Sequence, residues 1–163
     1  MKVLGIDPGI SNTGYGLVEE AARRLSALAS GTIKTAPSDE MAVRLDVLYR
    51  GVTEVVERLA PDAVVLEELF FNTNQKSVMA VGQARGVILL ACGHAGMPVV
   101  EYTPLQVKQT VTGNGNAKKE QVRYMVGALL GTRDLPSSLH ECDALAMAIC
   151  HLHSRRMAGL TGG

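Results

Sequence analysis

Four residues that could bind a divalent metal ion stand where strands or helices are expected to begin or end. Asp7 ends the apolar run 2–6, and Glu67 ends the apolar run 63–66. His140 and Asp143 are three residues apart, so they share one face of a helical segment. Three carboxylates and one imidazole suit Mg²⁺ or Mn²⁺, and two such ions about 3.5–4 Å apart would support in-line phosphodiester hydrolysis. The sequence therefore predicts a metal-dependent hydrolytic site.

Each of these residues also has a simpler interpretation. Asp7 precedes Pro8-Gly9 and could cap that turn by accepting backbone N–H bonds from Gly9 or Ile10. The carboxylates could instead form ion pairs with basic residues, although neither turn has one nearby in sequence. A lone histidine on a helix is usually structural, and this interpretation is preferred for His94, His151 and His153. Three carboxylates that need partners favour the metal site for His140.

The elements that position these residues follow from periodicity. Strands are predicted at 2–7, 14–18 and 24–34, with a hairpin at 21–23, which makes the first three strands antiparallel. A helical stripe follows over 38–60, with Ser38 as the predicted N-cap. The next strand, 62–68, is reached through a helix and should lie parallel to the first. Asp7 and Glu67 should then emerge at the same edge of the sheet, where sites form in α/β folds.

The remaining chain continues the α/β pattern. A long helix is predicted over 74–95, in which Gly82 and Gly86 permit close approach to another helix, in the core or across a dimer. A strand at 98–102 and helices from 104 and over 118–130 follow. Ser138 and Glu141 predict a capping box at the start of the last helix. We expect one domain over residues 1–157 and a disordered tail over 158–163.

Composition limits the class of protein. The chain has 163 residues, of which 47% are hydrophobic and 20% are charged, as in an ordinary globular domain. It has no apolar run long enough to span a membrane and no signal-peptide pattern, so no membrane partner is expected. Its three cysteines form no CxxC pair, which argues against a zinc knuckle or a disulfide framework. A reducing cytoplasm is the expected location.

The charges are unevenly distributed, although the formal net charge is +0. Residues 1–68 are net acidic and residues 69–133 are net basic. This basic region is either a solvated surface or a phosphate-binding face. The candidate phosphate contacts are Lys108, Lys118, Lys119 and Arg123. The lysines at the start of the helix oppose its dipole, which a role in phosphate contact would explain, although a solvated helix end is the alternative.

The two phenylalanines of the chain are adjacent, at Phe70 and Phe71 in an expected loop directly after Glu67-Glu68. They either pack beneath the loop or stack on bases of a nucleic acid, which contributes about 1–3 kcal/mol per base.

The order of elements resembles the RNase H-like fold, with a five-stranded mixed sheet flanked by helices. Six motifs narrow the resemblance to the RuvC family of Holliday-junction resolvases: GIDPG at 5–9, TGYG at 13–16, LEELFF at 66–71, GQARGV at 82–87, QVKQTV at 106–111 and DALAMAI at 143–149. The match extends from about residue 2 to about residue 153.

The resemblance implies an endonuclease that resolves four-way DNA junctions in recombination and repair by paired symmetric nicks, leaving 5′-phosphate and 3′-hydroxyl ends. Asp7, Glu67 and Asp143 match catalytic carboxylates of the family, and His140 occupies a fourth position that is often Asp. Phe70 matches an aromatic residue that contacts a junction base, with Phe71 as a second contact, and Lys108 and Lys119 match basic residues near the scissile phosphate. The implied partners are junction DNA, a second copy of the chain and the RuvA–RuvB branch-migration complex.

Two other functions are compatible with parts of the sequence. The stretch 7–11 faintly resembles a phosphate loop of the actin and sugar-kinase ATPases, but those proteins need two related domains and a second such loop. A junction-binding module without catalysis would have the same fold. All four metal-ligand positions hold competent ligands here, which favours the enzyme.

Overall fold

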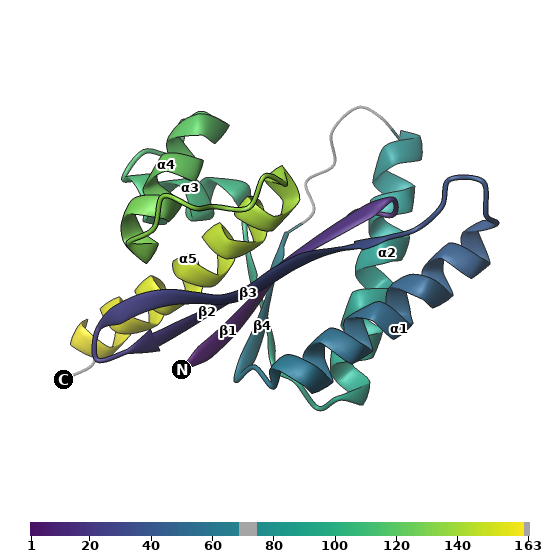
Figure 1. Ribbon diagram of the computed structural model, residues 1–163, viewed down its shortest axis with the longest axis horizontal. Coiled ribbons are helices and arrows are strands. Elements are labelled where there is room, and N and C mark those ends of the chain that lie inside the picture. The colour runs from purple at the N-terminus through teal and green to yellow at the C-terminus, as the bar shows by residue number, and fades with distance from the viewer. Residues whose placement is uncertain (69–74, 162–163) are drawn as a thin grey trace.

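A computed structural model describes residues 1–68 and 75–161 of the chain. The strands are β1 (Lys2–Asp7), β2 (Asn12–Ala21), β3 (Arg24–Lys34), β4 (Ala63–Glu67) and β5 (Val99–Tyr102). The helices are α1 (Met41–Leu59), α2 (Gln75–His94), α3 (Pro104–Thr112), α4 (Lys119–Leu130) and α5 (Leu139–Thr161). These elements form the predicted α/β architecture, shown in Figure 1.

The five strands form one mixed sheet in the order β3-β2-β1-β4-β5. β1 pairs antiparallel with β2, and β2 with β3, whereas β1 and β4, and β4 and β5, are parallel. The predicted antiparallel start and parallel continuation are therefore confirmed. The parallel pairing follows because α1 carries the chain back across one face of the sheet before β4 begins.

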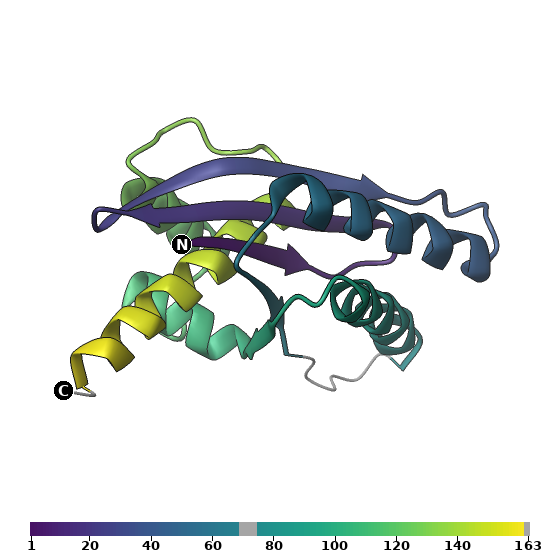
Figure 2. The same ribbon diagram turned by 90° about the horizontal axis from the view of Figure 1, so that it is seen from below.

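Helices cover both faces of the sheet. α1 and α2 pack on one face, and α3, α4 and α5 lie on the other (Figure 1). Strand alternation divides the core accordingly. Leu4 and Ile6 of β1 pack with α1 and α2, whereas Val3 packs in the cluster that includes α5. Figure 2 shows the sheet between these layers from below, with the amino terminus beside α5. None of the described helices has the length and apolarity that a membrane crossing requires.

α5 lies unusually close to the sheet because glycines face it. A Cβ atom added at Gly5 would overlap the carbonyl oxygen of Ala144, and one at Gly14 would overlap the backbone of His140. Any side chain at these strand positions would push α5 away from the sheet. The glycines therefore set the distance between the start of α5 and the end of β1.

Three local predictions need correction. α1 begins at Met41 with Glu40 at its N-cap, because residues 36–39 form a turn in which the amide of Asp39 donates to the carbonyl of Ala36. Ser38 therefore caps no helix. The predicted capping box of Ser138 and Glu141 is also wrong, because the Glu141 carboxylate instead accepts hydrogen bonds from two hydroxyl groups on β3. α5 continues to Thr161, into the segment where a disordered tail is expected.

Candidate active site

Asp7 and Glu67 lie side by side in the sheet because their strands are parallel neighbours. The β1–β4 register ends with Ile6 opposite Leu66, one residue before each carboxylate. Ile6 and Leu66 point toward α1 and α2. Since successive residues of a strand face opposite sides, Asp7 and Glu67 point toward α5. The predicted convergence of these two acids at one edge is confirmed.

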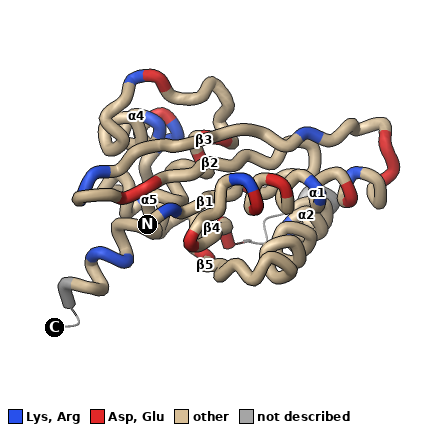
Figure 3. The backbone as a smooth tube through the Cα atoms, turned by 60° about the horizontal axis from the view of Figure 1, so that its bottom comes forward, with Lys and Arg blue, Asp and Glu red and all other residues tan. Residues whose placement is uncertain are grey.

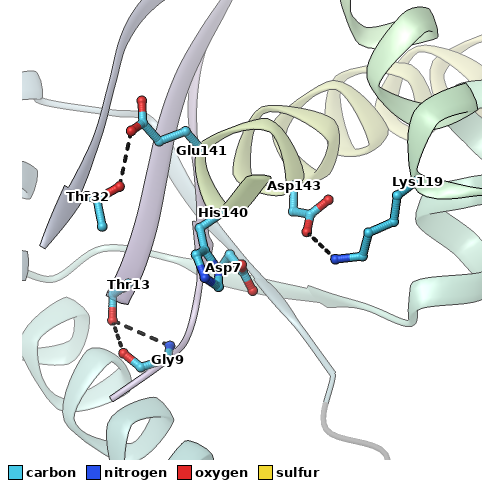
Figure 4. A network of polar contacts seen from close by, with 8 residues as sticks. All are labelled: Asp7, Gly9, Thr13, Thr32, Lys119, His140, Glu141 and Asp143. Carbon is cyan, nitrogen blue, oxygen red and sulfur yellow. Dashed lines mark hydrogen bonds and ion pairs between the residues drawn. The ribbon is translucent and has the colours of Figure 1, made fainter. Parts of the chain in front are cut away.

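The first turn of α5 completes the site. His140 Nδ1 lies 2.7 Å from Asp7 Oδ2, across 133 residues of sequence. Asp143, one turn along the same helix, points toward α4, as Figure 4 shows. The contact of Asp7 with His140 excludes the simpler interpretation of Asp7 as a turn cap. Gly9 N instead lies 3.5 Å from the hydroxyl of Thr13, which itself donates to the carbonyl of Gly9 at 2.6 Å.

Two lysines border this group of acids. Lys119 Nζ, at the start of α4, lies 3.2 Å from Asp143 Oδ2. Lys108, on α3, lines the same cavity of about 440 Å³ as the four predicted metal ligands. The other lining residues are mostly apolar: Pro104, Val107, Val122, Leu139, Ala146 and Met147. The cavity is therefore lined by both charged and apolar side chains.

The electrostatics of the cavity favour a bound cation. Burial, together with the neighbouring charges of Asp7 and Asp143, raises the pKa of Glu67 to about 7, against the lowering effect of Lys119 and Lys108. Burial also raises the pKa of Asp7, although its hydrogen bond with His140 opposes the change. The Asp143 charge raises the pKa of Lys119. The carboxylates thus destabilise one another in the absence of a cation.

The chain has extensive similarity to known proteins. Residues 3–151 match the family of the crossover junction endodeoxyribonuclease RuvC. The RuvC of Syntrophomonas wolfei is 52% identical over 158 residues, which cover 97% of this chain and 92% of the relative. The RuvC of Moorella thermoacetica is 54% identical over 151 residues, covering 93% and 90%. This chain belongs to the RuvC family.

Solved structures of the RuvC family share the fold. Thermus thermophilus RuvC in complex with a Holliday junction substrate is 40% identical and has a TM-score of 0.91, covering 97% of this chain and 96% of the other. The yeast mitochondrial resolvase Ydc2 is 11% identical with a TM-score of 0.74, which shows the fold alone. Family membership makes this chain an endodeoxyribonuclease of a metal-dependent family, and it confirms the RNase H-like resemblance drawn from the motifs.

The donor set of this RuvC-family site fits a hard divalent cation. Three carboxylates and one imidazole line one cavity. Burial, and after it the charges of neighbouring carboxylates, raises the pKa of Glu67 and of Asp7, so a cation would stabilise their ionised forms. Among the described residues, no three acidic, histidine or cysteine side chains are gathered closely enough to form a complete ligand cluster. Figure 4 shows Asp143 pointing toward Lys119, with which it forms an ion pair, and Asp7 beside His140.

The remaining predicted DNA contacts differ in position. Lys118 is exposed at the N-cap of α4 and does not line the cavity. Arg123, further along α4, does not line the cavity either, and its Nη1 lies 3.5 Å from Cys142 Sγ. Both α4 and α1 carry basic and acidic residues (Figure 3). Phe70 and Phe71 lie outside the described residues.

Two residues near the site were not predicted from the sequence to have a role there, although Glu141 was predicted to take part in a capping box. Glu141 accepts hydrogen bonds from Ser30 Oγ at 2.6 Å and Thr32 Oγ1 at 3.1 Å, which ties the first turn of α5 to β3. Arg85 of α2 contacts the end of β4. Sequence spacing gives no signal for Glu141, because its partners are more than 100 residues away. Arg85 had one signal, its position within the GQARGV motif.

The other predicted structural histidines have partners in the core or on a helix. His151 Nδ1 lies 3.0 Å from the hydroxyl of Tyr102, and His94 Nδ1 lies 2.7 Å from the hydroxyl of Tyr49. Neither residue lines the cavity that holds His140. Their structural interpretation agrees with these contacts.

Proposed function

We propose that this chain resolves four-way DNA junctions by cutting two strands symmetrically, with Asp7, Glu67, His140 and Asp143 as its catalytic metal ligands. The observation that carries the proposal is the convergence of these four side chains on one cavity bordered by Lys108 and Lys119. Membership of the RuvC family supplies the substrate class. Recombination and DNA repair are the processes that require such cleavage.

The proposed cofactor is Mg²⁺ or Mn²⁺, with two ions per site. Asp7, Glu67 and Asp143 would supply oxygen ligands, and His140 would supply a nitrogen ligand, which suits Mn²⁺ better than Mg²⁺. The ions would supply Lewis acidity for an attacking water and for the leaving oxygen. Asp7 is the best candidate to contact both ions, because it lies on a rigid strand between β2 and β4.

The chain's own residues would orient the scissile phosphate. Lys119 and Lys108 stand at the border of the cavity, where their charges would offset those on the phosphate oxygens in the transition state. Attack of water on the phosphorus breaks its bond to the 3′ oxygen, so the products carry a 5′-phosphate and a 3′-hydroxyl.

Further DNA contacts are proposed for Lys118 and Arg123 on α4, and for Phe70 and Phe71. The two basic residues would bind phosphates along a DNA arm, which makes binding dependent on salt concentration. An aromatic side chain would stack on a base that is unpaired at the crossover. The Thermus thermophilus relative, solved with a Holliday junction substrate, supports this class of ligand.

We also propose a two-fold homodimer, because a four-way junction offers two equivalent strands to cut. α2 exposes Met79 (68%) and Leu90 (52%). A Cβ added at Gly82 or Gly86 meets no described heavy atom within 4 Å, so these small residues do not serve close packing within the described chain. Of the two places predicted for close packing of α2, the core and a dimer interface, the dimer interface is therefore favoured. Docking on a RuvA–RuvB branch-migration complex and a cytoplasmic location are proposed from family membership.

A synthetic four-way junction tests the proposed function. Each strand is labelled in turn, and the protein is incubated with the junction in Mg²⁺ or Mn²⁺, with a linear duplex of the same sequence as the control. The expected result is cleavage of the junction at symmetric positions in opposite strands, with nicks that DNA ligase seals. Tight binding of the junction without cleavage in either metal would contradict the enzyme and leave a junction-binding module.

A further inference from the structure

Arg85 joins the ends of β4 and β5 from the face of the sheet opposite the active site. Its Nη1 donates a hydrogen bond to the main-chain carbonyl of Glu67 at 2.8 Å. Its Nη2 forms an ion pair with the carboxylate of Glu101 on β5. The Arg85 side chain is only 12% exposed, so this guanidinium is held in a defined place rather than solvated at the surface.

The strand register explains why Glu67 needs this support. Pairing of β4 with β1 stops at Leu66, so Glu67 has no partner residue on β1, and only β5 continues beside it with Tyr102 opposite. Asp7 likewise pairs on one side only, with Gly14 of β2. The backbone of Glu67, a proposed catalytic residue, therefore has no strand pairing on the side of β1.

The contact of Arg85 with the Glu67 backbone and the Glu67 side chain lie on opposite faces of the sheet. Leu66 lies opposite Glu101 and packs toward α2, which puts Glu101 on the same side as Arg85. The Glu67 side chain points the other way and lines the active-site cavity. Arg85 thus contacts only the backbone of Glu67 and leaves its carboxylate available.

We propose that Arg85 is a positioning residue, which fixes the Glu67 carboxylate by linking the Glu67 carbonyl to Glu101. The inference rests on the proposed metal-dependent cleavage. A planar guanidinium can donate to the Glu67 carbonyl and to the Glu101 carboxylate at once. A lysine ammonium is a point charge and does not reproduce this double contact. Groups that orient metal ligands typically change metal affinity or activity by about 10–100-fold when they are removed.

Two substitutions at Arg85 test the proposal. Arg85→Met removes both contacts and keeps most of the side-chain volume. Arg85→Lys retains a positive charge beside Glu101 but not the double contact. Arg50→Met is the matched control, because Arg50 is 78% exposed on α1 and its single ion pair, with Asp46, is on the same helix. Thermal unfolding is measured for every variant, so that cleavage is compared at a temperature where all are folded.

Three measurements separate positioning from a structural role: the single-turnover cleavage rate at saturating junction, the Kd for the junction in metal-free buffer, and Mn²⁺ binding without DNA. Mn²⁺ binding is followed from the paramagnetic resonance signal of the free ion. For Arg85→Met we expect at least a ~10-fold loss of cleavage rate, weaker Mn²⁺ binding and a junction Kd within about twofold of wild type. Arg85→Lys should show a smaller change in the same direction, and Arg50→Met none.

The outcomes distinguish the inference from the proposed function. Unchanged cleavage and Mn²⁺ binding in the folded variants would overturn the role of Arg85, even if their melting temperatures fall. A parallel loss of junction affinity with normal Mn²⁺ binding would also overturn it. If Arg85→Met does not fold, the same criteria apply to Arg85→Lys. A wild-type protein that binds Mn²⁺ but cuts no junction would contradict the proposed function, and the Mn²⁺ comparison would still decide whether Arg85 positions Glu67.

Discussion

At the scale of single residues, the active site holds carboxylates that burial, and to a smaller extent mutual repulsion, makes costly to ionise. Burial is the largest cause that raises the pKa of Glu67 to about 7, and the charges of Asp7 and Asp143 add to it. A buried carboxylate with a raised pKa holds its proton more tightly in the folded protein than in the unfolded chain. Without metal, the ionised form of Glu67 therefore destabilises the fold.

Glu67→Gln is expected to stabilise the metal-free protein at alkaline pH. The folded-state pKa of Glu67 is raised from 4.5 to about 7, so wild-type stability from this group is present below pH 4.5 and is lost as the pH rises to about 7. The melting temperature of Glu67→Gln should exceed that of wild type by about 3 °C or more at pH 8 in a metal chelator, and much less at pH 4.5. Adding Mn²⁺ should raise the melting temperature of wild type more than that of Glu67→Gln. If wild type and Glu67→Gln have equal melting temperatures at both pH values, the ionised Glu67 carboxylate does not destabilise the fold.

Lys119→Ala is expected to reduce cleavage while changing stability little. The Lys119 side chain is 65% exposed, and an exposed ion pair such as that with Asp143 contributes about 0–1 kcal/mol. Loss of a phosphate contact should lower the slope of log K against log salt by about 0.9 and the cleavage rate by at least ~10-fold. Arg24→Ala, at the β2–β3 hairpin, is the control of equal charge. An unchanged salt slope for Lys119→Ala would mean that Lys119 is a solvated helix end.

At the scale of elements, the site depends on the close approach of α5 to the sheet. Gly5 and Gly14 remove the side chains that would keep the helix away, and Glu141 ties its first turn to Ser30 and Thr32. The result is that a helix residue, His140, reaches the carboxylate at the end of β1.

Gly14→Ala should therefore affect both stability and cleavage. The added Cβ would overlap the backbone of His140, which cannot rotate away as a flexible side chain could, so the start of α5 must shift. We expect a loss of about 1–3 kcal/mol in the free energy of unfolding, measured by urea denaturation, and a slower cleavage rate. Gly159→Ala is the matched control near the other end of α5. A Cβ there meets no described atom within 4 Å, so stability should rise by up to ~1 kcal/mol. Equal effects of the two substitutions would show that the close approach is unimportant.

Local sequence patterns predicted most of this architecture. The apolar run of β1 and the helical stripe of α1 identify a buried strand and an amphipathic helix, and the order of elements then gives the parallel pairing of β1 with β4. From this, the meeting of Asp7 and Glu67 followed directly. Contacts made by single side chains across the fold could not be predicted. Glu141 matched a local capping motif, yet hydroxyl groups on β3 compete for its carboxylate, and that competition depends on tertiary structure.

At the scale of the whole molecule, the sheet separates two layers with different tasks. The layer of α3, α4 and α5 carries the cavity and its lysines, and the layer of α1 and α2 supports the strands from behind (Figure 1). The exposed apolar residues of α2 are therefore on the face of the sheet opposite the site, where a second copy could bind without covering the cavity.

Leu90→Lys is expected to dissociate the proposed dimer. The Leu90 side chain is 52% exposed in the single chain, and a charge there would have to be desolvated in an interface formed by α2. Sedimentation velocity should show a dimer for wild type and a monomer for Leu90→Lys, and paired nicking of one junction should be lost with it. Leu28→Lys, at a residue 47% exposed on β3, is the control. A dimer that persists in Leu90→Lys would exclude α2 as its interface.

The central claim is that the carboxylates at this cavity catalyse metal-dependent junction cleavage, and Asp7→Asn tests it most directly. The substitution keeps the size of the side chain and a partner for His140 but removes a charged oxygen ligand. The measurement is single-turnover cleavage of a four-way junction in Mn²⁺, together with the junction Kd in metal-free buffer. We predict that cleavage falls by at least ~1000-fold while the Kd changes by less than about threefold, because phosphate contact and metal binding come from different residues. Cleavage by Asp7→Asn at a rate near that of wild type would contradict the assignment of this site.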